Sequence, residues 1–151
     1  MKERRISSVT QINRSALLAY PVKQMYDLVN DIAMYPQYLD GCVGARIISQ
    51  DESTMLARLD LSKKGIRQSF TTRNIMVDSS HIKMQLVDGP FKRFSGQWVF
   101  TPLSETACKV SLTLEFELTS MAMKMAAGKL FSKVSANLVD ALSKRAKEIY
   151  G

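Results

Sequence analysis

The stretch from Cys108 to Leu118 alternates strictly between apolar and polar residues. Successive side chains of a β-strand point to opposite faces, so this alternation predicts a strand with one buried and one solvated face, as in an antiparallel sheet. From Thr119 or Ser120, either of which is a good N-cap, to Tyr150 the apolar residues recur at helical spacing instead. Such a helix is about 45 Å long, enough to cross an entire sheet. The chain therefore predicts a sheet with one long helix packed on it.

The rest of the chain completes this picture. From Val43 to Leu118 the apolar residues recur with a period of two, which predicts further antiparallel strands. The expected strands cover residues 54–63, 66–74, about 82–86 and about 94–100, with turns at 64–65 and 89–90. Before them we expect a strand over 5–14, a helix with Pro21 at its first position that closes at 30–31, and a second short helix or turn over 32–36. The fold class is α+β, a curved antiparallel sheet of about six to seven strands that wraps the long C-terminal helix.

Length and composition predict one domain over residues 1–151, large enough to bury a core and even a cavity without disulfides. No apolar run approaches the ~20 residues of a membrane span, and the first residues lack the apolar region of a secretory signal. We therefore expect a cytoplasmic protein, with peripheral contact to the inner membrane as an open alternative. Cys42 and Cys108 are expected to be reduced core residues, because two distant cysteines make neither a disulfide framework nor a metal pair.

The net charge of +7 lies at the two ends of the chain. Residues 1–14 carry +3 and residues 121–151 carry +4, whereas the residues between them hold 11 basic and 11 acidic side chains. On the predicted helix the apolar stripe comprises Phe131, Val134, Leu138, Leu142 and Ile149. The opposite side carries Lys129, Lys133, Lys144 and Lys147, with Asp140 among them. These lysines could meet the backbone of structured RNA or an anionic lipid surface, or they could simply form the solvated side of the helix. The sequence predicts neither a stacking platform for sequence-specific RNA reading nor DNA as a partner.

Three groups of residues resemble a known family. They are Asp88-Gly89-Pro90-Phe91-Lys92-Arg93-Phe94 continued by 96–103, the pair of segments 26–31 and 35–39, and the segment 70–74. Together they are similar to the coenzyme Q-binding branch of the START-like superfamily of polyketide cyclases and lipid transport proteins, and within it to the bacterial ribosome association toxin subgroup. The resemblance covers nearly the whole chain and implies the helix-grip fold of START and Bet v 1-like proteins. Asp40, where relatives usually have proline, and the methionine-rich start of the last helix depart from the family pattern.

The resemblance implies two functions, and both stay open. The first is binding of a hydrophobic small molecule, with ubiquinone as the expected ligand, between sheet and helix in support of respiration. The second is binding to the large ribosomal subunit, which blocks its association with the small subunit, as the toxin of a toxin–antitoxin pair does. From the charge pattern we expect the basic ends of the chain, with the four lysines of the last helix, to make this contact. Methionine and aromatic side chains suit a polyprenyl chain and a quinone ring, although ordinary core packing is the alternative for each. The expected ligand-binding residues are Tyr35, Phe70, Met84, Phe91, Trp98, Phe100, Met125 and Phe131.

An enzyme of the polyketide cyclase type is the least favoured interpretation. Such chemistry needs an acid or base placed in the cavity, and His81, the single histidine, alternates with Ile82 and Met84, so it is expected to point away from their face. The sequence shows no carboxylate pair, nucleophile motif or glycine-rich phosphate loop, and no histidine cluster for zinc. We therefore expect a non-catalytic protein that needs no metal and no resident cofactor.

Overall fold

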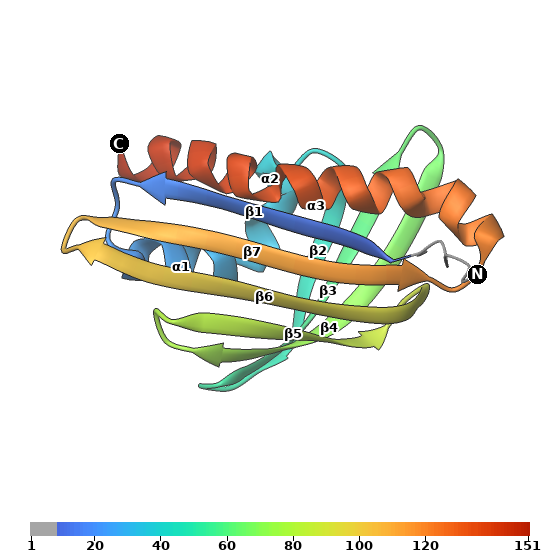
Figure 1. Ribbon diagram of the computed structural model, residues 1–151, viewed down its shortest axis with the longest axis horizontal. Helices are drawn as coiled ribbons and strands as arrows, with labels where there is room; N and C mark the ends of the chain where they lie inside the picture. The colour runs from blue at the N-terminus through green and yellow to red at the C-terminus, as the bar shows by residue number, and fades with distance from the viewer. Residues whose placement is uncertain (1–8) are drawn as a thin grey trace, which may run out of the picture.

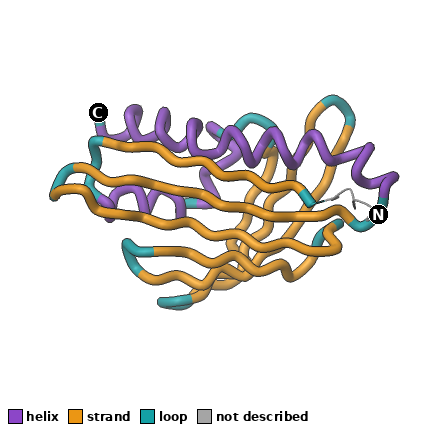
Figure 2. The backbone as a smooth tube through the Cα atoms, viewed as in Figure 1, coloured by secondary structure: helices purple, strands orange, loops and turns teal. Residues whose placement is uncertain are grey.

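The computed structural model describes residues 9–151. Seven strands and one long helix account for most of them, as Figures 1 and 2 show. The elements in chain order are β1 (Thr10–Leu18), α1 (Val22–Asn30), the 3-10 turn η1 (Ile32–Met34), α2 (Tyr35–Tyr38), β2 (Cys42–Gln50), β3 (Thr54–Lys63), β4 (Ile66–Val77), β5 (His81–Asp88), β6 (Phe91–Ser104), β7 (Ala107–Leu118) and α3 (Met121–Tyr150).

All strands belong to one sheet in the order β1-β7-β6-β5-β4-β3-β2, and every neighbouring pair is antiparallel. The sheet is curved, and α3 runs along its open side beside β1 (Figure 1). From there α3 contacts β1 and β7 at one edge of the sheet and β3 and β4 toward the other. The expected α+β class and the long helix gripped by a curved sheet are thus confirmed.

The predicted element boundaries differ from the observed ones in several places. The strands predicted over about 82–86 and about 94–100 are longer, at His81–Asp88 and Phe91–Ser104. The strand predicted over 66–74 continues to Val77. The first strand, predicted over 5–14, is found at Thr10–Leu18, and residues 5–8 of the prediction lie outside the described residues. Pro21 is the N-cap of α1 and not its first helical residue, because its ψ of 147° is that of an extended chain.

The helix α3 begins after Ser120, whose Oγ accepts a hydrogen bond of 3.0 Å from the backbone N–H of Met123. Of the predicted apolar stripe, Phe131, Val134 and Leu142 are buried and Leu138 is half-buried. Ile149 was expected on the same stripe but is 47% exposed, so that part of the prediction is wrong. The last turn packs through Tyr150 instead, whose ring lies 5.9 Å from that of Tyr20 and whose hydroxyl donates to Gln24 O at 3.3 Å. This contact leaves Ile149 facing solvent.

A glycine sets how closely the middle of α3 approaches the sheet. Gly41, between α2 and β2, has a φ of +91°, a conformation that other residues adopt only with strain. A Cβ built at this position would lie 2.7 Å from Val134 Cγ2 on α3. The absence of a side chain at Gly41 therefore allows α3 to pack directly against the start of β2.

Candidate functional site

The inner face of the sheet and the buried side of α3 enclose an apolar cavity. Its wall is built from β3 to β7, from the segment that contains η1 and α2, and from α3. The centre of a water molecule can reach about 80 Å³ inside it. Since one water needs roughly 10–15 Å³ of such space, the cavity holds several waters or a small ring as it stands. A long isoprenoid chain fits only if side chains of the wall move outward.

Six of the eight expected ligand-binding residues line this cavity. They are Tyr35, Phe70, Met84, Phe91, Trp98 and Phe131. The two others, Phe100 and Met125, lie elsewhere. Phe100 is buried beyond the cavity wall, where its ring meets Tyr26 edge-on at 5.5 Å. Met125 is 81% exposed on the outer side of α3, because residue 125 falls opposite the buried Ala127 and Phe131 on the helical wheel.

Five of the six phenylalanines form one cluster at one end of the cavity. Phe91 is at its centre, with ring centroids 4.8 Å from Phe131, 5.2 Å from Phe94, 5.6 Å from Phe116 and 5.7 Å from Phe70. Aromatic pairs in these tilted and edge-on arrangements attract one another beyond their area burial. The cluster forms one end of the cavity wall, so a ligand that enters between these rings must displace one of them.

Two buried polar side chains lie in the apolar wall, which also includes the half-buried Asn30 and Ser135. Thr72 and Asn74, on the inward face of β4, are the buried polar residues of the described chain, 6% and 4% exposed. The Thr72 hydroxyl donates to Asn74 Oδ1 at 2.8 Å, which leaves the amide NH₂ of Asn74 as a donor at the cavity wall. Tyr35 is also polar, but its hydroxyl donates to Val29 O at 2.5 Å, and burial holds its pKa well above the usual value, so it stays neutral. This arrangement can bind an apolar molecule that offers a hydrogen-bond acceptor.

Sequence reasoning did not select Thr72, Asn74, Phe94 or Phe116 as wall residues. A signal for Thr72 and Asn74 was present, because they share the even-numbered face of their strand with Phe70. Within residues 9–151, the cavity wall contains no Asp, Glu, His, Lys or Arg. His81 lies at the surface, with its Nδ1 3.1 Å from Ser80 Oγ.

The outer side of α3 carries the second candidate site. Lys129, Lys133, Lys144 and Lys147 are all exposed. The ion pairs formed within residues 9–151 all use other cations, so these four lysines have no carboxylate partner within 4 Å there. Lys133 lies near enough to Asp40 to help lower the pKa of that carboxyl, which is held down chiefly by its hydrogen bond to Lys63. The four lysines can therefore meet an anionic partner without first breaking an ion pair.

The carboxylates gather on a different part of the surface. A groove beside α1 and the C-terminal turn of α3 contains Asp27, Asp31, Asp51, Glu52 and Asp78. Its one cation, Lys23, pairs with Asp27 at 3.2 Å and with Asp78 at 3.1 Å. The middle of the chain, neutral in total, therefore has a local excess of carboxylates in this groove.

The two cysteines are buried free thiols, as expected. Burial raises the pKa of Cys42 to about 11 and also raises that of Cys108, so both are protonated at neutral pH. In the described part of the chain, no three His, Cys, Asp or Glu side chains are grouped so that they could hold a metal ion. No helix among residues 9–151 combines the length and the apolar character that crossing a membrane requires.

Comparison with known proteins identifies the family. The family described as polyketide cyclase/dehydrase and lipid transport matches residues 18–143. The ribosome association toxin RatA of Vibrio cholerae is 49% identical over 141 residues, which cover 93% of this chain and 98% of the relative. A more distant relative, the mitochondrial coenzyme Q-binding protein COQ10 homolog B of Xenopus laevis, is 24% identical over 145 residues, covering 93% of this chain and 59% of the relative.

Solved structures show the same fold. The ZhuI aromatase/cyclase of Streptomyces sp. R1128 superposes with a TM-score of 0.80 at 15% identity and covers 95% of this chain and 96% of its own. A START superfamily protein of Mycobacterium smegmatis superposes with a TM-score of 0.75 at 20% identity, and the match covers 92% of this chain and 98% of that protein. The chain therefore belongs to the polyketide cyclase/dehydrase and lipid transport family, in the branch of the ribosome association toxins.

Proposed function

We propose that the protein binds the large ribosomal subunit and blocks its association with the small subunit, which inhibits translation. The observation that carries the proposal is the 49% identity, over nearly the whole chain, to relatives named ribosome association toxin. Because of this identity, ubiquinone binding, which was the first hypothesis from the motifs alone, becomes the second candidate function. The distant COQ10 homolog is the comparison that supports ubiquinone binding, and its identity is half as high.

The exposed lysines of α3 supply the physical basis. From Lys129 to Lys147 the helix rises about 27 Å, so its four lysines can contact several phosphates along a structured RNA. Each phosphate contact releases bound counterions, so added salt weakens it. The affinity of a complex with four such contacts should fall roughly 100-fold when the salt concentration rises from 50 to 200 mM. No aromatic platform accompanies the lysines, so the proposed contact reads the shape and backbone of RNA and not its bases.

Gradient co-sedimentation with purified large subunits tests the proposal. The variant Lys129→Glu/Lys133→Glu should bind about tenfold to 100-fold more weakly, because two charge-assisted contacts become repulsive. The matched control is Lys83→Glu/Lys109→Glu, which reverses two exposed lysines on the sheet and should bind normally. Equal binding of both variants, or an equal loss in both, contradicts the assignment to α3.

The second candidate function is non-catalytic binding of a hydrophobic molecule, with ubiquinone as the first candidate. The aromatic-lined cavity and the donor of Asn74 support it, and a wall without acid or base supports the absence of catalysis. Purification under native conditions, solvent extraction and mass spectrometry test it. A quinone or lipid near one equivalent is expected from the wild type, and much less from Ala57→Leu, whose larger side chain fills the cavity. Repeated extraction without any such molecule contradicts the idea.

A further inference from the structure

One end of the molecule combines features that neither proposed site uses. At this end α3 begins, β1 begins, and the β5–β6 turn lies close by (Figure 1), where Pro90 O accepts a hydrogen bond of 2.9 Å from the backbone N–H of Thr119. A groove here joins the start of β1 to α3 and is lined by Thr10, Leu118, Lys124 and Lys129. Four residues at this end, here called the α3-start surface, are Met121, Met125, Lys124 and Lys92.

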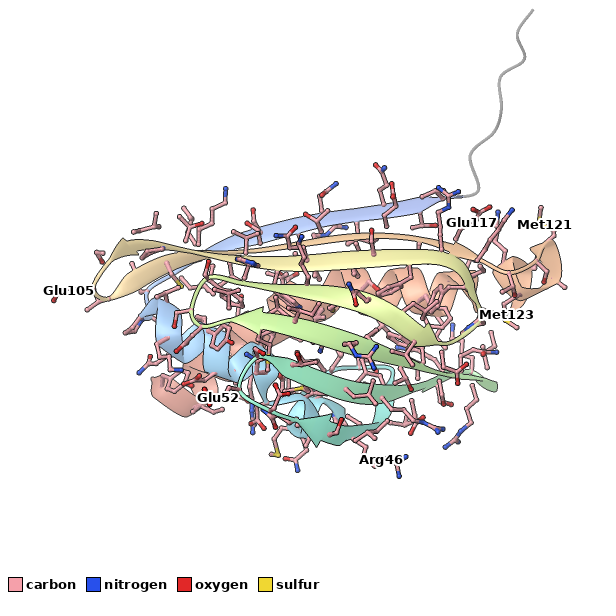
Figure 3. The ribbon with its side chains drawn as sticks, turned by 90° about the horizontal axis from the view of Figure 1, so that it is seen from below. Arg46, Glu52, Glu105, Glu117, Met121 and Met123 are labelled. Atoms are coloured by element: carbon pink, nitrogen blue, oxygen red, sulfur yellow. The ribbon has the colours of Figure 1, made fainter. Side chains whose placement is uncertain are left out.

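The methionines of this surface are exposed without a role in the core. Met121 is 65% exposed and Met125 is 81% exposed, the highest value among the large apolar residues of the described chain. They are four residues apart, so they lie on the same side of α3, one turn from each other. Figure 3 shows Met121 at the tip of the helix and Met123 on the side that turns toward the sheet. The first two turns of α3 therefore expose Met121 and Met125, with the half-exposed Lys124 between them in the sequence.

Unpaired positive charge lies beside the methionines. Lys92, after the β5–β6 turn, is exposed and Lys124 is half-exposed, and neither is in an ion pair of the described residues. The nearby acid Glu117 is already paired with Arg93 at 3.5 Å. This end thus has exposed apolar side chains beside two free lysines, the composition of surfaces that enter the boundary between lipid headgroups and acyl chains.

The same end lies next to the closed end of the cavity. Phe91, at the centre of the phenylalanine cluster, directly precedes Lys92 in the sequence, and Phe131 lies between one and two turns of α3 beyond Met125. The pairing of β5 with β6 runs only from His81–Val99 to Gln85–Ser95, so the two strands are unpaired near their turn. The phenylalanine cluster therefore separates the cavity from the α3-start surface, where the sheet is least tightly closed.

We propose that the α3-start surface docks on a lipid bilayer that contains anionic lipids. Met121 and Met125 enter the acyl boundary, and Lys92 and Lys124 stay at the level of the headgroups. A bilayer fits better than RNA because RNA phosphates offer nothing to a thioether side chain, whereas acyl chains do. Docking in this orientation places the phenylalanine cluster, and the cavity behind it, against the membrane.

Flotation with lipid vesicles tests the proposal on the full-length protein. Vesicles of phosphatidylglycerol and phosphatidylcholine in equal parts are compared with pure phosphatidylcholine, and the anionic vesicles are expected to bind the protein more strongly. Met121→Gln/Met125→Gln keeps good helix formers but removes the apolar contact, and should weaken binding about tenfold. Lys92→Glu/Lys124→Glu should weaken it at least about 25-fold, since each lysine contributes about fivefold near an anionic surface.

Two controls change the same kinds of residue elsewhere. Leu17→Gln/Leu103→Gln removes exposed apolar side chains, 71% and 55% exposed, at the opposite end of the strands. Lys83→Glu/Lys109→Glu makes the same change in charge on the sheet. Both controls should float with anionic vesicles like the wild type, and circular dichroism should show that every variant is folded. Vesicle binding that is equal in wild type and α3-start variants overturns the proposal. So does a loss of ribosome co-sedimentation in these variants with unchanged flotation, because that result assigns the surface to the ribosome.

Discussion

The close approach of α3 to Gly41 predicts how the two halves of the fold are coupled. In Gly41→Ala the new Cβ would lie 2.7 Å from Val134 Cγ2, a distance that real Cβ contacts do not reach, so α3 must move or the loop must shift. The backbone adds a second penalty, because a φ of +91° is strained for alanine. Gly65→Ala is the matched control: its φ is +83°, and nothing lies within 4 Å of the new Cβ.

The two variants separate backbone strain from packing. Alanine in a left-handed conformation destabilises the folded state by about 1–2 kcal/mol. The same substitution lowers the conformational entropy of the unfolded chain, which offsets about 0.4–1 kcal/mol of that loss. Gly65→Ala should therefore lower the free energy of unfolding by about 1 kcal/mol. Gly41→Ala has the same strain plus overpacking of about 1–3 kcal/mol, for a total of about 2–4 kcal/mol.

Urea denaturation followed by circular dichroism measures both changes. A double-mutant cycle adds the decisive comparison, because Val134→Ala alone should destabilise the protein by about 2 kcal/mol through loss of buried methyl groups. In the Gly41→Ala background the same change relieves the clash and should be less harmful by about 1–2 kcal/mol. Equal losses for Gly41→Ala and Gly65→Ala, together with strict additivity of Gly41→Ala and Val134→Ala, refute the proposed contact.

Three other changes test single features of the fold. Ser120→Ala removes the N-cap of α3 and should lower stability by about 1 kcal/mol in the same urea experiment. Phe131→Ala opens a void in the phenylalanine cluster and should cost about 3–5 kcal/mol, seen as a lower Tm. The pKa of Cys42 is raised from 9.0 to about 11 in the fold, so its contribution to stability is complete below pH 9 and is lost between pH 9 and 11. In Cys42→Ala the alkaline decline in unfolding free energy should be shallower over that interval.

Periodicity predicted the large elements well because each satisfies a single local rule. The strand 54–63 and its turn at Lys64-Gly65 were predicted with their observed limits, since the alternation is unbroken and both turn residues have positive φ. The start of helix α3 was predicted to within two residues and its end at Tyr150 was predicted correctly. Ser120 is a cap, and no proline interrupts the helical pattern after it.

The failures occur where the partner of a residue is far away in the sequence. Ile149 fits the helical stripe, but whether it is buried depends on what covers the last turn of α3, and Tyr150 takes that contact with Tyr20 and Gln24. Phe100 fits the inward face of β6, as Trp98 does, yet α1 covers it through Tyr26 while Trp98 reaches the cavity. Alternation indicates the face of a strand on which a residue lies, but not which element packs over it.

The position of α3 explains why one family can carry both ribosome-related and ligand-related names. The same helix lines the cavity with Phe131 and Val134 and presents Lys129 and Lys133 to solvent. Neighbouring positions on it therefore serve different surfaces, and substitutions can separate them. A charge change at Lys133 leaves the cavity wall intact, and a change at Val134 leaves the outer charge intact. If the helix carries two independent sites, the change at Lys133 should abolish ribosome binding alone. The change at Val134 should abolish only the binding of an apolar molecule.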